Sequence, residues 1–352
     1  MEPSEKTSRF PAKAVYDFAE RVFLGAGVER AAAGQTAKGL WLASLRGVDS
    51  HGFRLIGHYL RAVQEGRVNP QPSFNFEQTS LSTGRLDADH AFGHAAGIRA
   101  MHHAIDLARE AGSGQVAVRN SSHCGAMAYF AFEACREDMI GIAFTNATPK
   151  MRTPNSTARF FGTNPVCLAA PMASEEPFCY DGSTTQMSLN KIRVYGERGL
   201  ELPPLCGADE KGNETCVPDE VVQLLPMGDY KGFGIAMILD IVCGLLTGMP
   251  AGNNVSDMFK DPFSQNRLLG QFYGALRIDV FEEPARFKAR LQEVADHIRS
   301  LPRREPNTPV QVPGDPEKAF QADREVYGIP ISAKELAQFE AIAKELGIEP
   351  LA

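Results

Sequence analysis

The chain has 352 residues, of which 43% are hydrophobic and 22% are charged, and this composition excludes an intrinsically disordered protein. The formal net charge of −7 argues against a nucleic-acid-binding protein, which usually carries a basic surplus or patch. A chain of this length exceeds one ordinary hydrophobic core, so we expect two lobes or one large elaborated domain.

The cysteines, the first residues and the most apolar run indicate the cellular compartment of the protein. The seven cysteines are scattered and form no C-x-x-C pair, which favours reduced thiols over a disulfide framework or a zinc site. Residues 1–9 are polar and hold no signal-peptide core. The most apolar run, residues 235–246, is short and contains Asp240, so it predicts a buried helix and no membrane span. We therefore expect a cytoplasmic protein with no membrane, nucleic-acid or metal partner.

The first seventy residues carry helical patterns. Apolar residues recur at helical spacing over 11–23, and an Ala-rich run over 29–45 predicts a second helix. A third helix is expected after Ser50, whose hydroxyl suits the N-cap position. The sequence Asn-Pro-Gln-Pro at 69–72 ends this pattern, so we assign residues 1–72 to an N-terminal helical segment.

Strand and helix patterns then alternate, which indicates an α/β sheet. The expected strands cover residues 81–87, 115–119, 140–145, 165–170, 177–181 and 275–280, and the expected helices cover 97–110, 127–136 and 230–247. The helix signal fades between 148 and 212. We assign residues 73–283 to an α/β cofactor-binding domain. Helices over 284–300 and 333–346 flank a Pro-rich loop, and we expect residues 284–352 to pack on the N-terminal segment.

The stretch Asp-Ser-His-Gly-Phe-Arg at residues 49–54 is the first candidate site. His51 would lie in the first turn of a helix, where the positive end of the helix dipole disfavours a protonated ring. Arg54 in the same turn can grip a carboxylate with two parallel hydrogen bonds. A capped surface helix with a solvated His51 and Arg54 is the alternative that the motif alone leaves open.

His123 follows a predicted strand and is the second candidate. Ligands bind at the carboxyl ends of strands in α/β sheets, and the small neighbours of His123 leave room for one. Seven of the eight histidines lie in the first 123 residues, so any histidine chemistry would come from that part of the chain. A partly buried, satisfied histidine is the alternative.

Four polar loops are weaker candidates for ligand binding. Asn146, Ala147 and Thr148 follow a strand and form either ligand contacts or an Asx-turn. The loop Asp181, Gly182 and Ser183 can accept ribose hydroxyls and bond phosphate. The other two are Lys231 with Gly232, at a helix start that suits phosphate, and the tight turn Pro313, Gly314 and Asp315, which would close over a nucleotide. A solvated lysine is the alternative for Lys231, and no G-x-G-x-x-G dinucleotide fingerprint is present.

The run Arg-Gly-Val-Asp-Ser-His-Gly at residues 46–52 resembles the signature of the type-2 malate/L-lactate dehydrogenase family. Similar blocks follow in the order of that family, at residues 66–70, 120–125, 162–165, 231–234 and 313–315. The resemblance implies NAD(P)-dependent interconversion of 2-oxo and 2-hydroxy acids on a mixed-sheet fold that is not Rossmann. It also implies a homodimer with cofactor and substrate near the subunit contact.

Carried over by motif, the resemblance assigns roles to the candidate residues. It makes His51 and His123 the two acid–base candidates, of which we favour His123, and it places Ser50, Arg54 and Tyr59 around the substrate. Cofactor contacts are expected at Asn146, Ala147, Thr148, Asp181, Gly182, Ser183, Lys231, Gly232, Pro313, Gly314 and Asp315.

The chain departs from the commoner family pattern at the substrate position. Many relatives carry an arginine one place after Arg54, where this chain has Leu55. The sequence leaves open NAD or NADP as the cofactor. It also leaves open an imine reductase acting on a cyclic imine 2-carboxylate, or a non-catalytic binding homologue.

Overall fold

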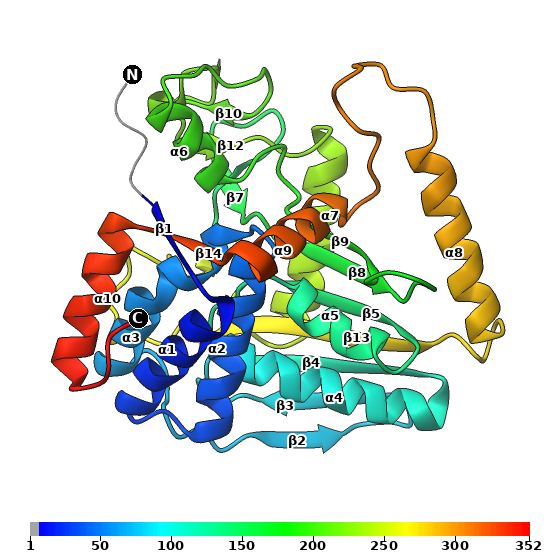
Figure 1. The fold of residues 1–352 in the computed structure, drawn as a ribbon, viewed down its shortest axis with the longest axis horizontal. Helices are drawn as coiled ribbons and strands as arrows, with labels where there is room; N and C mark the ends of the chain where they lie inside the picture. The colour runs from blue at the N-terminus through cyan, green and yellow to red at the C-terminus, as the bar shows by residue number, and fades with distance from the viewer. Residues whose placement is uncertain (1–6) are drawn as a thin grey trace.

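The computed structural model describes residues 7–352, and its largest element is a seven-stranded mixed sheet (Figure 1). Only the β3–β4 pair in this sheet is parallel, and the neighbouring pairs are antiparallel. This confirms the expected α/β fold with a mixed, non-Rossmann sheet. In spatial order the strands are β2 (Asn75–Gln78), β3 (Thr83–Asp87), β4 (Ser113–Ser121), β13 (Leu269–Arg277), β5 (Met139–Thr145), β8 (Val166–Ala170) and β9 (Phe178–Gly182).

Two helices pack on this sheet because its strands alternate buried and accessible residues. α4 (Gly93–Ala111) packs on β4 and β13, and α5 (Ala128–Cys135) packs on β5 and β8. Their small and aromatic side chains form one continuous core with the strands. The turn between β4 and α5, which carries His123, thereby lies at a fixed point above the sheet.

The second core is helical. Apolar faces of α1 (Ala12–Gly25), α2 (Arg30–Leu45), α3 (Ile56–Gln64) and α10 (Ala333–Leu346) meet in it. The strands β1 (Thr7–Phe10) and β14 (Ile329–Ser332) pair antiparallel, so the C-terminal segment lies beside the start of the chain. α8 (Pro284–Arg299) stands at the other side of the molecule (Figure 1), where it packs against Met172 and Phe178. The domain boundaries at residues 72 and 284 stay a prediction.

A smaller lobe is formed by segments that lie between strands of the main sheet in the chain. Its strands are β6 (Met151–Arg152), β7 (Arg159–Phe161), β10 (Gly207–Ala208), β11 (Glu214–Thr215) and β12 (Gln223–Leu224). It also contains α6 (Leu189–Glu197), where the sequence predicted no helix. The helix begins at Ser188, whose hydroxyl accepts a hydrogen bond from the Lys191 N–H at 3.3 Å. It is short, and its one fully buried apolar residue is Ile192, so its periodic signal was weak.

The helix predicted to begin at Ser50 begins at Ile56 instead. Two 3₁₀ turns, Asp49–His51 and Phe53–Leu55, precede it, and the extended backbone of Gly52 separates them. The Ser44 hydroxyl accepts the Phe53 N–H at 2.9 Å. Ser50 therefore caps no helix, and the expectation that it does is wrong.

Two further helices differ from the sequence prediction. α9 (Asp315–Tyr327) occupies part of the expected Pro-rich loop, because Pro316 suits the first turn of a helix, where its missing N–H costs nothing. α7 (Tyr230–Asp240), expected to be buried, continues into a π-helical turn, Ile241–Leu245. Its outer face leaves apolar side chains exposed, including Ile238 at 59% and Leu245 at 65%. Within residues 7–352, no helix combines the length and apolar character that a membrane crossing needs.

The contact between β13 and the π-helical turn gives a stability prediction. A Cβ atom at Gly270 would lie 1.7 Å from the Cys243 carbonyl oxygen, so the two backbones touch directly. We expect Gly270→Ala to lower the free energy of unfolding by about 1–3 kcal/mol, the range for an overpacked core. Urea unfolding measures it. Gly274→Ala in the same strand is the control, because its Cβ meets Ile142 at an ordinary 3.5 Å. Equal losses in both variants would contradict the prediction.

Candidate active site

A cavity of about 630 Å³ lies between the helical segment, the start of α5, β9 and the turn before α9. Its walls include seven of the residues that the sequence predicted at separate points of the chain, namely Ser50, His51, Asp181, Gly182, Ser183, Pro313 and Gly314. The fold therefore brings the first candidate motif, one strand-end loop and the C-terminal turn together.

The turn that carries His51 is fixed from both sides. Ser50 Oγ lies 2.8 Å from His51 Nδ1. Arg324, a buried side chain of α9, contacts Asp49 at 2.5 Å (Nη1–Oδ1) and 2.9 Å (Nη2–Oδ2) and also donates to the Ser44 carbonyl. A bidentate pair of this kind restricts both position and orientation. Residues near the C-terminus thus hold the histidine at the cavity wall.

His123 lies just behind His51 and is paired with Tyr59. The Tyr59 hydroxyl is 2.5 Å from His123 Nδ1, and the two histidine rings stack with centroids 5.8 Å apart. The loop is supported by Gly93 in α4, where a Cβ would come within 2.7 Å of the His123 carbonyl oxygen. The structure thus brings together His51, His123 and Tyr59, which the sequence placed in two different motifs.

Burial keeps these histidines neutral. It lowers the pKa of His51, and burial together with the neighbouring His51 and Arg267 holds the pKa of His123 well below its usual range. The buried His94 beneath them has its pKa lowered to about 3 for the same reason. Burial also raises the pKa of Tyr59 well above 10, so its hydroxyl stays protonated. A neutral imidazole keeps one acceptor nitrogen, which suits it to receive a proton.

Asp181 supplies the acid group of the cavity. Its Oδ2 accepts the Ala128 N–H at 2.8 Å at the start of α5. Solvent reaches the side chain through the cavity, but the protein around its other sides raises the pKa to about 6. The backbone N–H groups of Ala128 and Met127 oppose this rise, and the carboxylate of Glu317 adds to it.

Several predicted residues do not line the cavity, and three of them are Arg54, Lys231 and Asn146. Arg54 is exposed, with its Nη1 3.4 Å from Asn190 Oδ1. Lys231 is exposed at the start of α7. Asn146 is buried and donates to the Pro250 carbonyl at 3.0 Å.

The remaining predicted contacts hold loops in place. The Ala147 N–H donates to Asn164, the Thr148 hydroxyl donates to the Ser256 carbonyl at 3.0 Å, and Asp315 pairs with Arg299 at 2.6 Å. Gly232 packs against the backbone of neighbouring loops, where a Cβ would lie 2.4 Å from the Met227 carbonyl. The ligand roles of these residues stay predictions.

The cavity also contains residues that sequence reasoning missed: Arg46, Tyr180, Gln311 and Glu317. The Arg46 guanidinium is buried, contacts Glu176 at 2.6 Å and lies 4.9 Å from the centre of the Phe132 ring. Arg46 opens the family-like motif but had no assigned role. Glu317 follows Pro316, and the helix start at this proline was the signal that would have found it.

The residues present fit a nicotinamide dinucleotide. Asp181 and Ser183 offer oxygen atoms for ribose hydroxyls, and the side-chain-free backbone at Gly125, Gly182 and Gly314 leaves room along the walls. Among residues 7–352, no group of three or more His, Cys, Asp or Glu side chains is placed to hold a metal ion.

Comparison with known proteins gives consistent matches over nearly the whole chain. The profile of a family described as malate/L-lactate dehydrogenase matches residues 10–340. A malate dehydrogenase of Pyrococcus abyssi is 32% identical, covering 99% of this chain and 97% of its own length. A ureidoglycolate dehydrogenase (NAD(+)) of Escherichia coli is 30% identical over 90% of each chain. The solved malate dehydrogenase structure from Pyrococcus horikoshii superposes with a TM-score of 0.89 at 29% identity, covering 99% of both chains.

The raised pKa of Asp181 predicts a pH-dependent stability. The folded-state pKa of about 6 exceeds the ordinary value of 3.8, so the contribution of this group is present below pH 3.8 and is lost as the pH rises through 6. Asp181→Asn has no carboxyl group to titrate at this position. The melting temperature of the variant, relative to that of the wild type, should therefore rise between pH 4 and pH 7. Glu175→Gln should change in the opposite sense between about pH 2 and pH 4.5, because Arg299 lowers the pKa of Glu175 from 4.5 to about 2. A difference in melting temperature between Asp181→Asn and wild type that stays constant from pH 4 to pH 7 would refute the prediction.

Proposed function

The chain belongs to the malate/L-lactate dehydrogenase family, and from this membership we propose that it interconverts a 2-oxo acid and its 2-hydroxy acid with a His general acid/base. The family is one of NAD-dependent oxidoreductases. The observation that carries the proposal is the cavity of about 630 Å³ with the Tyr59–His123 pair directly behind its His51 wall. A dinucleotide and a small acid need a cavity with a proton-transfer group at or beside its wall.

His123 is the residue we propose to move the proton. When bound, the nicotinamide supplies or accepts the hydride at the carbon that carries the oxygen. Tyr59 orients the His123 ring, because its hydroxyl oxygen can accept the Nδ1–H and so leave the lone pair of Nε2 for the substrate. In the oxidation direction the neutral ring accepts the hydroxyl proton. In the reduction direction a substrate carboxylate beside the ring favours the protonated form that donates it.

His51 is the second candidate for the same role. It lines the cavity directly, whereas His123 lies behind it, and Ser50 fixes its ring through Nδ1. We favour His123, since its Tyr59 partner is buried and holds one tautomer.

We propose NAD as the cofactor, held by Asp181, Gly182, Ser183, Pro313 and Gly314. The charges of the cavity support NAD over NADP. Glu176 neutralises the lining cation Arg46, while Asp181 and Glu317 add negative charge. A 2′-phosphate would face this negative wall without a free cation among the lining residues.

The experiment that tests the function is a panel of substrates with NADH and with NADPH, followed by nicotinamide absorbance. The panel contains 2-oxo acids, their amides and a cyclic imine 2-carboxylate. Turnover of 2-oxo acids with NADH supports the proposal. Turnover of the imine alone would identify an imine reductase, and nucleotide binding without any turnover would identify a binding homologue.

We also propose a homodimer that buries the outer face of α7 and the π-helical turn. This face exposes Met237, Ile238, Ile241, Leu245 and Leu246, each at 43% or more. Contiguous exposed apolar side chains of this kind mark protein–protein contacts. A twofold contact would bury the same face on both subunits.

Replacing the proposed acid–base residue should separate catalysis from binding. We expect His123→Asn to lower kcat by roughly 100-fold or more, because general acid–base help contributes about that much. The affinity for NADH, measured by fluorescence titration, should stay within twofold. His102→Asn, an exposed histidine of α4, is the matched control. Normal turnover in His123→Asn together with loss in His51→Asn would assign the role to His51.

The dimer proposal predicts a change of assembly in one variant. Ile238→Glu places a charge in the apolar face, so we expect sedimentation velocity to show a dimer for wild type and a monomer for this variant. Val326→Glu, at a position 73% exposed on α9, should leave the dimer intact. A monomeric, active wild type at assay concentration would rule the dimer out.

A further inference from the structure

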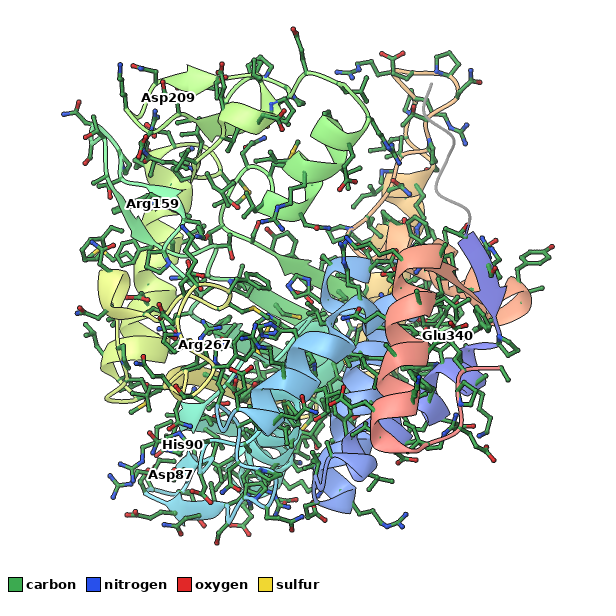
Figure 2. The ribbon with its side chains drawn as sticks, turned by 90° about the vertical axis from the view of Figure 1, so that its left-hand side faces the viewer. Asp87, His90, Arg159, Asp209, Arg267 and Glu340 are labelled. Carbon is green, nitrogen blue, oxygen red and sulfur yellow. The ribbon has the colours of Figure 1, made fainter. Side chains whose placement is uncertain are left out.

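Arg267 is a buried cation on the loop that leads into β13 (Figure 2). Its side chain is 3% exposed. Nε donates to Ser256 Oγ at 2.6 Å, and Nη2 lies 3.0 Å from the Ser256 carbonyl and 3.4 Å from Thr148 Oγ1. Two donors are thus held by neutral groups, while Nη1 makes no hydrogen bond among residues 7–352.

No carboxylate within residues 7–352 lies within 4 Å of this guanidinium. The buried Arg324 and Arg46 each contact an acid, Asp49 and Glu176 respectively. Arg67 lacks such a partner too: two of its nitrogens donate to carbonyl oxygens and its guanidinium faces the Phe263 ring, while its Nε has no partner. Asp257 and Asp261 act on Arg267 from beyond 4 Å, and Asp257 already pairs with Lys150. A buried charge without a contacting counter-ion is costly, so an anion from outside the chain would stabilise Arg267.

Arg267 and His123 lie at the same end of the β4–β13 pair. Leu269 of β13 pairs with Ser121 of β4 in an antiparallel register. Arg267 precedes Leu269 by two residues and His123 follows Ser121 by two residues, so both loops leave the sheet at this end. The charge of Arg267 is accordingly among the causes that lower the pKa of His123, and it also acts on that of Tyr59.

We propose that Arg267, and not Arg54, binds the carboxylate of the substrate. The inference rests on the proposed function, since it names the anion site of the same reaction. A carboxylate offers two coplanar oxygens that match the guanidinium fork. The C2 oxygen of a 2-oxo or 2-hydroxy acid is one carbon away from that carboxylate, and His123, at the same end of the strand pair, is the proton-transfer group proposed for it. Arg54 is exposed and contacts Asn190, and Leu55 beside it carries no charge.

The test compares Arg267→Gln, Arg267→Lys and Arg54→Gln, with Arg159→Gln, a half-buried arginine of the smaller lobe, as the control. The readouts are kcat and KM for a 2-oxo acid, NADH affinity by fluorescence, and binding of oxamate, an unreactive carboxylate, by calorimetry on the NADH complex. We expect Arg267→Gln to raise KM and weaken oxamate binding by about 100-fold, as loss of a charge-assisted pair does. NADH affinity should stay within twofold. Arg267→Lys keeps the charge but loses the fork, so it should be intermediate. Arg267→Lys also tests the proposal if Arg267→Gln fails to fold.

A second readout separates recognition from a structural role. Added guanidinium ion should partly restore the turnover of Arg267→Ala and have no such effect on Arg54→Gln. Loss of oxamate binding in Arg54→Gln with normal binding in Arg267→Lys would overturn the proposal. Equal loss of NADH affinity in the Arg267 variants would overturn it as well. If wild type neither turns over 2-oxo acids nor binds oxamate, the proposed function itself fails, whereas a fully active Arg267→Gln removes the Arg267 assignment alone.

Discussion

The ion pair between Asp49 and Arg324 joins the two ends of the chain at the candidate active site. Arg324 is buried in α9, and its two contacts with Asp49 at 2.5 and 2.9 Å fix the 3₁₀ turn that carries His51. The same helix begins with the turn that lines the opposite wall of the cavity. Because one helix supplies both the wall and the anchor, the width of the cavity depends on this pair.

Electrostatics at the site follow from burial more than from any single charge. Burial keeps His51, His94 and His123 neutral, and the positive charge of Arg267 lowers the pKa of His123 further. Arg267 is the buried cation in this group. A ligand that brings one negative charge would therefore change the protonation of His123 and satisfy Arg267 at once. Substrate binding and proton transfer become linked through charge.

The sequence predicted those parts of the molecule that depend on local patterns. The strands over 139–145 and 166–170 and the helices α4 and α5 follow from apolar periodicity, and His51, Asp181 and Gly314 were recognised from motifs. The sequence did not predict features that depend on residues far apart in the chain. Ser50 caps no helix because the Ser44 hydroxyl accepts the Phe53 N–H. Arg267 belongs to no motif, and its place at the end of the β4–β13 pair becomes visible only in the fold. The sequence predicted a buried α7, but one face of this helix is exposed, because an apolar run has the same pattern in a core helix and in a helix with an exposed apolar face.

Gly270 of β13 contacts the Cys243 carbonyl of the π-helical turn directly. The outer surface of this turn is exposed, and the loop of Arg267 leads into β13. The Thr247 hydroxyl lies beside the same contact, so the turn and the strand are packed closely together. A partner that covered the outer surface would therefore touch a turn that packs directly on the strand following Arg267. In the proposed homodimer, dilution would then act as an inhibitor, because separating the subunits would uncover the turn that packs on the strand leading from the proposed anion site.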